Sequence, residues 1–329
     1  MGPAHAVVET EHLGKSFGSG VKEVQAVTDL NLAVEQGEIF GFLGPNGAGK
    51  TTTLRMLSTL LRIGSGRAVV AGHDVAKSPR KVRERIGYVS QLGGANPQAT
   101  GWDNLILQGM LYGDSRKSVI ARAGELMAAL EIEEFAKRKV ITYSGGQKRR
   151  LDIAMGIIHR PEVLFLDEPT TGLDPQNRAN MWSQIRKLRD GGTTVFLTTH
   201  YLEEADALAD RISIMDHGSI IADGTPSELK GQIGGDAITI EIAESASGEA
   251  VMHTLSSISE LHSIAQDGLR IHCYANGGTR ILPQVIRTLD EAKVAIESIA
   301  VAQPSLDDVF LKFTGHSLRD TKVEKEGGA

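Results

Sequence analysis

Nine residues, Gly44 to Thr52, have the types and spacing needed to bind phosphate. The first eight, GPNGAGKT, fit the pattern G-x-x-x-x-G-K-[ST] and stand directly after an apolar run and directly before a helix-like one. Glycine lets backbone N–H groups approach phosphate oxygens closely, and the start of a helix attracts an anion. We expect the whole loop to surround bound phosphates: Gly44, Pro45, Asn46, Gly47, Ala48, Gly49, Lys50, Thr51 and Thr52.

Two side chains of this loop have separate expected roles. Lys50 would reach the β and γ phosphates of a nucleoside triphosphate, and the Thr51 hydroxyl would coordinate Mg²⁺. The alternative is a glycine-rich turn between a strand and a helix that binds nothing. By itself the loop names neither the nucleotide nor the reaction.

Carboxylates suited to phosphoryl transfer end the apolar run VLFLDE, Val163 to Glu168. Asp167 is expected to hold Mg²⁺, and Glu168 to orient and polarise an attacking water as the general base. An apolar run that ends in acids is also typical of any buried strand that meets solvent. The phosphate loop upstream and Pro169 directly after the two acids favour the catalytic interpretation.

A second candidate anion site lies in YSGGQ, Tyr143 to Gln147. Ser144 is a good helix N-cap, and Gly145 and Gly146 would leave the N–H groups of the first turn exposed beside it. An ordinary capped helix is the alternative. One chain thus offers two anion-binding helix starts, whereas a single nucleotide hardly needs both.

The elements that must position these residues alternate along the chain. Short apolar runs such as EIFGFLG and TTVFLTTH alternate with longer amphipathic ones, which predicts an α/β domain over residues 6–229. Residues 92–160 show little strand pattern and read as a mainly helical insertion. A glycine-rich break at 231–236 separates a small α/β sandwich, residues 236–314, and the polar residues 315–329 are expected to form a disordered tail.

Composition excludes several classes of protein. With 329 residues and a net charge of -6, the chain has no overall positive charge to attract nucleic acid. Cys273 is the only cysteine, so no intrachain disulfide forms, which fits a reducing compartment such as the cytoplasm. The N-terminus shows no export or lipidation signal, and no stretch approaches the roughly 18 apolar residues of a membrane span. We expect another chain to supply any membrane part.

The first domain resembles the ABC ATPases, a P-loop NTPase family, along all of residues 6–229. The YSGGQ segment is similar to the family's signature motif, with Tyr143 in place of the leucine that commonly opens it. The resemblance implies ATP and Mg²⁺ as ligands. It also implies that two copies pair head to tail, with Ser144, Gly145, Gly146 and Gln147 of each covering the ATP held by the other's phosphate loop.

Four more positions match the family in the expected order. Gln91 resembles the Q-loop glutamine that meets metal and water, and Asp174 the D-loop aspartate at the subunit seam. His200 resembles the switch histidine that faces the γ-phosphate, and Phe17 the aromatic residue that stacks on adenine. Taken alone, Gln91, His200 and Phe17 each have an ordinary structural interpretation: a surface glutamine, a structural histidine and a core aromatic.

The C-terminal segment PSLDDVF, Pro304 to Phe310, is similar to the extension of the daunorubicin-resistance type of exporter ATPase. This implies a subunit at the cytoplasmic face of the membrane that energises efflux of a drug, hydrophobic natural product or lipid through a separate permease. A capped amphipathic helix is the plainer interpretation of the segment. A non-transport ATPase that acts on nucleic acid or ribosomes, and an importer ATPase, are the alternative functions.

Overall fold

The computed structural model describes residues 6–18, 20, 23–243 and 247–314, so the predicted tail at 315–329 lies outside the described residues. The chain divides into two compact units, Met1–Ile220 and Ile221–Ala329. The division falls inside β10 (Ser219–Gly224), earlier than the glycine-rich break at 231–236. The reason is that α8 (Pro226–Gly231) packs against α11 (Leu306–Thr314), where Lys312 Nζ donates a hydrogen bond of 2.7 Å to the carbonyl of Gln232.

Two sheets form the framework of the first unit. The larger has the strand order β10-β9-β3-β8-β7-β6, and its neighbours β9, β3, β8, β7 and β6 pair in parallel. The other strands of this larger sheet are β3 (Ile39–Leu43), β6 (Ile86–Val89), β7 (Val163–Asp167), β8 (Thr194–Thr199) and β9 (Arg211–Asp216). The smaller, antiparallel sheet has the order β2-β1-β4-β5, with β1 Ala6–Phe17, β2 Val24–Glu35, β4 Ser65–Val70 and β5 His73–Asp74.

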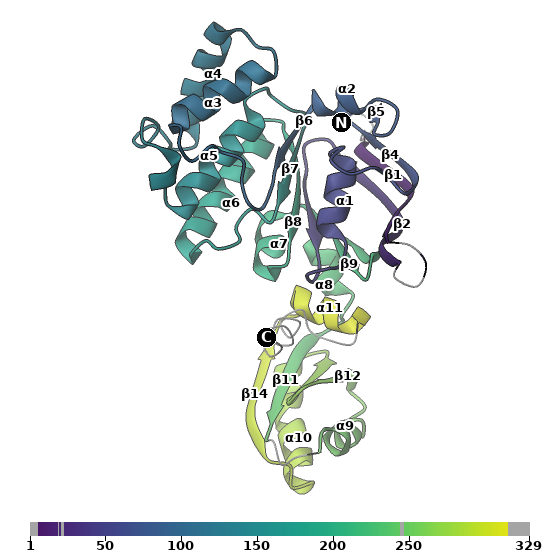
Figure 1. Ribbon diagram of the computed structural model, residues 1–329. Helices are drawn as coiled ribbons and strands as arrows, with labels where there is room; N and C mark the ends of the chain where they lie inside the picture. The colour runs from purple at the N-terminus through teal and green to yellow at the C-terminus, as the bar shows by residue number, and fades with distance from the viewer. Residues whose placement is uncertain (1–5, 19, 21–22, 244–246, 315–329) are drawn as a thin grey trace. The chain divides into compact units, whose positions relative to one another are not determined.

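Helix α1 (Lys50–Leu57) lies between the two sheets (Figure 1) and contacts β2, β4, β7 and β8. The central strands are buried on both faces, as parallel strands usually are. Phe165 of β7 and Phe196 of β8 belong to the core on the α1 side, while Leu164 and Leu166 join the core under the helices of the insertion. This packing fixes the strand ends that carry the candidate site.

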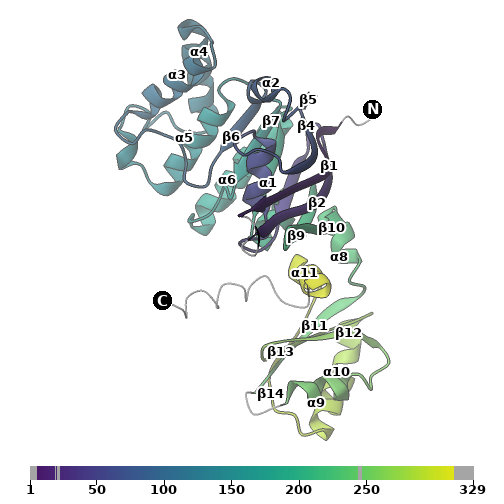
Figure 2. The ribbon, with the colours of Figure 1, turned by 45° about the vertical axis from the view of Figure 1, so that its right-hand side comes forward.

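The insertion predicted at residues 92–160 is mainly helical, as expected. It contains α3 (Gly101–Leu111), α4 (Arg116–Ala129), a short 3-10 helix (Val140–Thr142) and α5 (Gly145–Ile157). In Figures 1 and 2, α3, α4 and α5 group together on the side of β6 away from α1. The other helices of the unit are α2 (Pro79–Arg83), α6 (Pro175–Asp190) and α7 (Leu202–Leu208).

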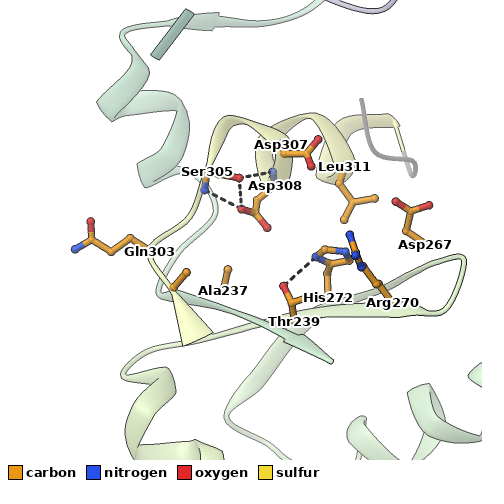
Figure 3. A pocket seen from close by; sticks show the side chains of 11 residues that line it. Ala237, Thr239, Asp267, Arg270, His272, Gln303, Ser305, Asp307, Asp308 and Leu311 are labelled. Carbon is orange, nitrogen blue, oxygen red and sulfur yellow. Dashed lines mark hydrogen bonds between the residues drawn. The ribbon is translucent and has the colours of Figure 1, made fainter. Parts of the chain in front are cut away.

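The second unit is built on a sheet of order β12-β13-β11-β14. The bounds are β11 Asp236–Ile242, α9 Gly248–Leu255, β12 Leu261–Asp267, β13 Arg270–Ala275, α10 Gly278–Glu291 and β14 Ile296–Ala302. Alternate residues of the sheet, such as Ile238, Ile240 and Ile271, form an apolar core with α9 and α10. On the opposite face, α11 and the sheet enclose a pocket lined by Thr239, His272 and Asp307 among others (Figure 3).

Within the described residues, none of the helices has both the length and the apolar character that crossing a bilayer requires.

Candidate active site

The phosphate loop stands between β3 and α1, where the sequence placed it. Gly47 and Gly49 have φ angles of 87° and 106°, a left-handed region that favours glycine. A Cβ on Gly49 would lie 2.3 Å from the carbonyl oxygen of Ala26, and one on Gly44 would lie 2.2 Å from that of Met215. The loop therefore requires glycine at these positions, because the backbone bends closely against neighbouring strands.

Lys50 opens α1 with its side chain folded into the loop. Its side chain is buried, and Nζ donates hydrogen bonds of 2.7 Å and 2.9 Å to the carbonyls of Gly44 and Pro45. Burial lowers the pKa of Lys50 to about 8, although the charges of Glu168 and Asp167 oppose this shift. Among the residues that the structure describes, no carboxylate forms an ion pair with Lys50, and such a buried cation is suited to an incoming polyanion.

Thr51 and Asp167, the two expected metal ligands, meet at the start of α1 and the end of β7. Thr51 Oγ1 donates a hydrogen bond of 3.0 Å to Asp167 Oδ1, and Thr198 Oγ1 donates one of 2.7 Å to the same oxygen. A hydroxyl and a carboxylate are hard oxygen donors that fit Mg²⁺. No group of three or more His, Cys, Asp or Glu side chains among the described residues could hold a metal, so other ligands, such as phosphates and water, would complete this shell.

Glu168, just past the end of β7, contacts the side chains of Gln91, Thr171 and His200. Its Oε2 accepts hydrogen bonds of 3.0 Å from Gln91 Nε2 and of 3.0 Å from Thr171 Oγ1. Its Oε1 lies 3.2 Å from His200 Nδ1, a close charge contact without the alignment of a hydrogen bond. The structure thus places Gln91, Glu168 and His200 in one cluster beside the phosphate loop.

The environment of Glu168 keeps its carboxylate ionised. Burial opposes ionisation, but the contact with His200, the charge of Lys50 and the Thr171 hydrogen bond outweigh it, so the pKa of Glu168 is lowered. An ionised carboxylate at neutral pH is the state that a general base needs.

The remaining candidate residues form a second group at the starts of α5 and α6. Ser144 Oγ accepts from the Gln147 N–H and Gln147 Oε1 from the Ser144 N–H, a complete capping box. Asp174 caps α6 through the Asn177 N–H, and a Cβ on Gly146 would lie 3.0 Å from Asn177 Oδ1. The hydrogen bonds of Ser144, Gln147 and Asp174 stay within these helix starts and do not reach the phosphate loop.

Phe17 ends β1 with 44% of its surface exposed, so it is not a core aromatic. Lys15 Nζ lies 5.4 Å from its ring centroid. An exposed ring is available for stacking against a planar ligand.

Three contributors to the site were not identified from the sequence. Thr198 holds Asp167, Thr171 holds Glu168, and the buried Arg149 of α5 donates to three backbone carbonyls around them. Thr171 closely follows LDEP, and Thr198 is the first residue of TTH. These positions offered a weak signal, because polar side chains at the ends of parallel strands often lie together at one edge of the sheet. Arg149 offered none, since Lys148 and Arg150 flank it with the same type of charge.

Family models and curated proteins match both units of the chain. The model described as ABC transporter matches residues 27–171, and the model described as ATP-binding protein DrrA1-3-like, C-terminal domain, matches residues 224–314. The chain is 44% identical to the daunorubicin resistance ATP-binding protein DrrA2 of Streptomyces coeruleorubidus, over 97% of this chain and 98% of that protein. It is 35% identical to the linearmycin resistance ATP-binding protein LnrL of Bacillus subtilis, over 95% of this chain and 100% of that protein.

A solved structure is similar to part of the chain. The dimeric post-hydrolysis state of the ATP-binding cassette MJ0796, bound to ADP and Pi, superimposes with a TM-score of 0.61 at 26% identity. The match covers 66% of this chain and 98% of that one.

Proposed function

The chain belongs to the ABC transporter family as an ATP-hydrolysing exporter subunit, and from this premise we propose that it works as a head-to-tail dimer. Each copy would hold Mg·ATP on its own phosphate loop and cover its neighbour's ATP. The pair would drive efflux of a hydrophobic natural product, drug or lipid through a separate membrane subunit.

The observation that carries the proposal is the separation of the site residues into two groups. Lys50, Glu168 and His200 gather around the phosphate loop, whereas the capped helix start at Ser144 lies at the start of α5, and α5 and α1 lie on opposite sides of β6 in both views (Figures 1 and 2). A second copy can bring its own Ser144 to this loop, as a two-fold dimer allows. The dimeric cassette with ADP and Pi supports this arrangement.

Hydrolysis would follow from the chain's own residues. Lys50 leaves its carbonyl partners for the phosphates, and Mg²⁺, held by Thr51 and Asp167 with Gln91 nearby, would neutralise developing charge on the phosphate oxygens. Glu168 accepts the proton of the attacking water, because its lowered pKa keeps it ionised. Isolated monomers should bind ATP yet hydrolyse it poorly, since half of each site is missing.

The surface beside Gln91 suits a membrane subunit. Leu92 is 97% exposed, and Leu107, Leu111 and Tyr112 of α3 and its end are also exposed, so the insertion carries several large exposed apolar side chains. Exposed apolar side chains that form a continuous patch mark docking surfaces. We assign this surface to an apolar segment of the permease, whose movement the Gln91–Glu168 contact would couple to ATP.

The direction of transport and the substrate class come from the relatives. DrrA2 and LnrL are named for daunorubicin and linearmycin resistance, which favours export of an antibiotic-like natural product over an importer or a nucleic-acid-dependent ATPase. Because the cytoplasm supplies ATP, the chain would act at the cytoplasmic face, bound to the permease.

Reconstitution tests the proposal. The tagged chain should copurify with an integral membrane protein, and vesicles that contain both should show ATP-dependent efflux of a hydrophobic drug and drug-stimulated ATPase activity. The Leu92→Asp variant should lose the membrane protein while the free chain keeps its ATP affinity. Stimulation by DNA or ribosomes, with no membrane partner recovered, would overturn the proposal.

A further inference from the structure

Arg149 carries a buried charge in the second turn of α5. Only 7% of its surface is exposed, and each of its three guanidinium nitrogens donates to a different backbone carbonyl. The distances are 2.6 Å to Ser90, 2.9 Å to Asp167 and 2.8 Å to Pro169. Burying a cation is costly without such partners, and these bonds commit the whole guanidinium to three backbone positions.

The three carbonyls belong to the neighbours of two site residues. Ser90 directly precedes Gln91, while Asp167 and Pro169 stand on either side of Glu168. One side chain therefore holds the backbone next to both partners of the Gln91–Glu168 hydrogen bond.

The backbone of Glu168 needs such support. Its φ angle is 46°, a left-handed conformation that is unfavourable for non-glycine residues and persists only where the surroundings enforce it. The Glu168 N–H donates to the carbonyl and the hydroxyl oxygen of Thr198, both at 3.1 Å. Arg149 supplies the corresponding restraint on the peptides before and after Glu168.

The same helix also holds the far side of the Gln91 loop. Asp152, one turn beyond Arg149, accepts hydrogen bonds of 3.0 Å from the Gly94 N–H and 3.3 Å from the Ala95 N–H. The loop that contains Gln91 is thus attached to α5 at Ser90 and again at Gly94.

We propose that Arg149 is the positioning residue that sets the Gln91–Glu168 contact and thereby the rate of hydrolysis. This inference rests on the proposed function, which makes Glu168 the base. Because α5 begins at Ser144, the helix start that would cover the neighbour's ATP is joined through Arg149 to the chain's own base. Arg149 thereby links the two nucleotide sites of the dimer.

Arg149→Lys tests the proposal, because a lysine keeps the charge but cannot bond three diverging carbonyls. We expect kcat to fall on the order of 10- to 100-fold, as displacement of a catalytic group by about 1 Å does, with ATP affinity within about twofold of wild type. Arg150→Lys is the matched control, since Arg150 donates to Glu131 and lies over the Phe135 ring, both in the insertion, and the variant should keep a wild-type kcat.

A second measurement separates positioning from general support of the fold. In a Gln91→Ala background, Arg149→Lys should reduce kcat less than it does in the wild type, because part of what it positions is already absent. The proposal would be overturned if the effects of the two substitutions on kcat simply multiply. It would also be overturned if Arg149→Lys had a normal kcat, or lost turnover and ATP affinity equally. If Arg149→Lys does not fold, Arg149→Gln replaces it; failure of both, with Arg150→Lys folded, would make the residue purely structural.

The outcomes also separate this inference from the proposed function. If the wild type is active, Glu168→Gln is inactive and Arg149→Lys is fully active, only the positioning role of Arg149 is disproved. A fully active Glu168→Gln would instead remove the assignment of the base itself.

Discussion

Gln91 Nε2 donates a hydrogen bond of 3.0 Å to Glu168 Oε2 across 77 positions of the chain. Thr171 Oγ1 donates to the same oxygen, so Oε1 is the oxygen that faces His200. The residue that begins the loop into the helical insertion therefore contacts the proposed base directly. Movement of the insertion would displace Gln91 and so change the position of Glu168.

Glu168→Gln should abolish turnover while ATP binding remains. Glutamine is nearly isosteric and can still accept from Gln91, but it cannot take a proton from water, which typically removes about 10²- to 10⁴-fold of rate. Single-turnover hydrolysis and equilibrium ATP binding measure the two effects. Glu203→Gln is the matched control, because Glu203 is an exposed residue of α7 that lies near Arg178, and this variant should hydrolyse ATP normally. Undiminished hydrolysis by Glu168→Gln would disprove the base assignment.

ATP affinity should weaken as pH rises through the pKa of Lys50. With a pKa of about 8 in the nucleotide-free protein, the protonated fraction falls from about 90% at pH 7 to about 10% at pH 9. Since the charged form binds phosphate, the affinity should fall about tenfold over this interval, with proton uptake on binding. Calorimetry in two buffers measures both. Lys50→Arg stays charged and should show no such pH dependence; a wild-type affinity that is flat from pH 7 to 9 would contradict the account.

His200→Ala should move the acid limb of the kcat/KM profile to higher pH. Burial acts to raise the pKa of Glu168, but the net pKa is lowered, and the contact with His200 is the largest of the effects that lower it. Without His200 the carboxylate protonates at a higher pH, so activity should begin to fall earlier on acidification. His217→Ala, on the exposed surface, should leave the limb in place. An acid limb that does not move in His200→Ala would show that the two side chains are not coupled.

Tyr274→Phe should destabilise the second unit. The buried Tyr274 hydroxyl donates a hydrogen bond of 2.9 Å to Asp308 Oδ1. Asp308 Oδ2 accepts hydrogen bonds from Ser305 at the start of α11, as Figure 3 shows. Loss of this bond leaves a buried carboxylate oxygen without its donor, at a cost of about 1–3 kcal/mol. Hydrogen exchange over residues 236–314 should accelerate.

A matched variant and a double-mutant cycle check this assignment. Tyr112→Phe removes a hydroxyl in the first unit while keeping the ring stacked on His159, so exchange over 236–314 should not change. Tyr274→Phe and Asp308→Asn should be non-additive, because they share one bond. Additive effects would show that the bond does not hold α11 in place.

The sequence predicted those parts of the site that are local in the chain. Gly44 to Thr51 and Asp167 to Glu168 each combine a strand end with the required side chains in a few consecutive residues, and the structure places both at the same edge of one parallel sheet. The helix N-cap at Ser144 was equally local. Contacts between distant residues could not be predicted in this way.

Arg149 and Thr198 show why. Arg149 reaches carbonyls 18, 20 and 59 positions away, and any residue can offer a carbonyl, so no side-chain pattern marks its partners. Thr198 stands in TTVFLTTH among similar threonines, and only the register of β7 with β8 opposes it to Asp167. The division inside β10 was missed because α8 is held by α11, a contact formed with a helix far along the chain.

Mixing two inactive variants tests the shared site most directly. Ser144→Arg blocks the helix start that would cover a neighbour's ATP, and Lys50→Ala removes the phosphate-loop cation. In a mixed dimer, the Lys50 of the first variant faces the Ser144 of the second, so one complete site exists. We predict that each variant alone is inactive and that the mixture hydrolyses ATP. A mixture as inactive as its two components, or full activity of Ser144→Arg alone, would contradict the head-to-tail site.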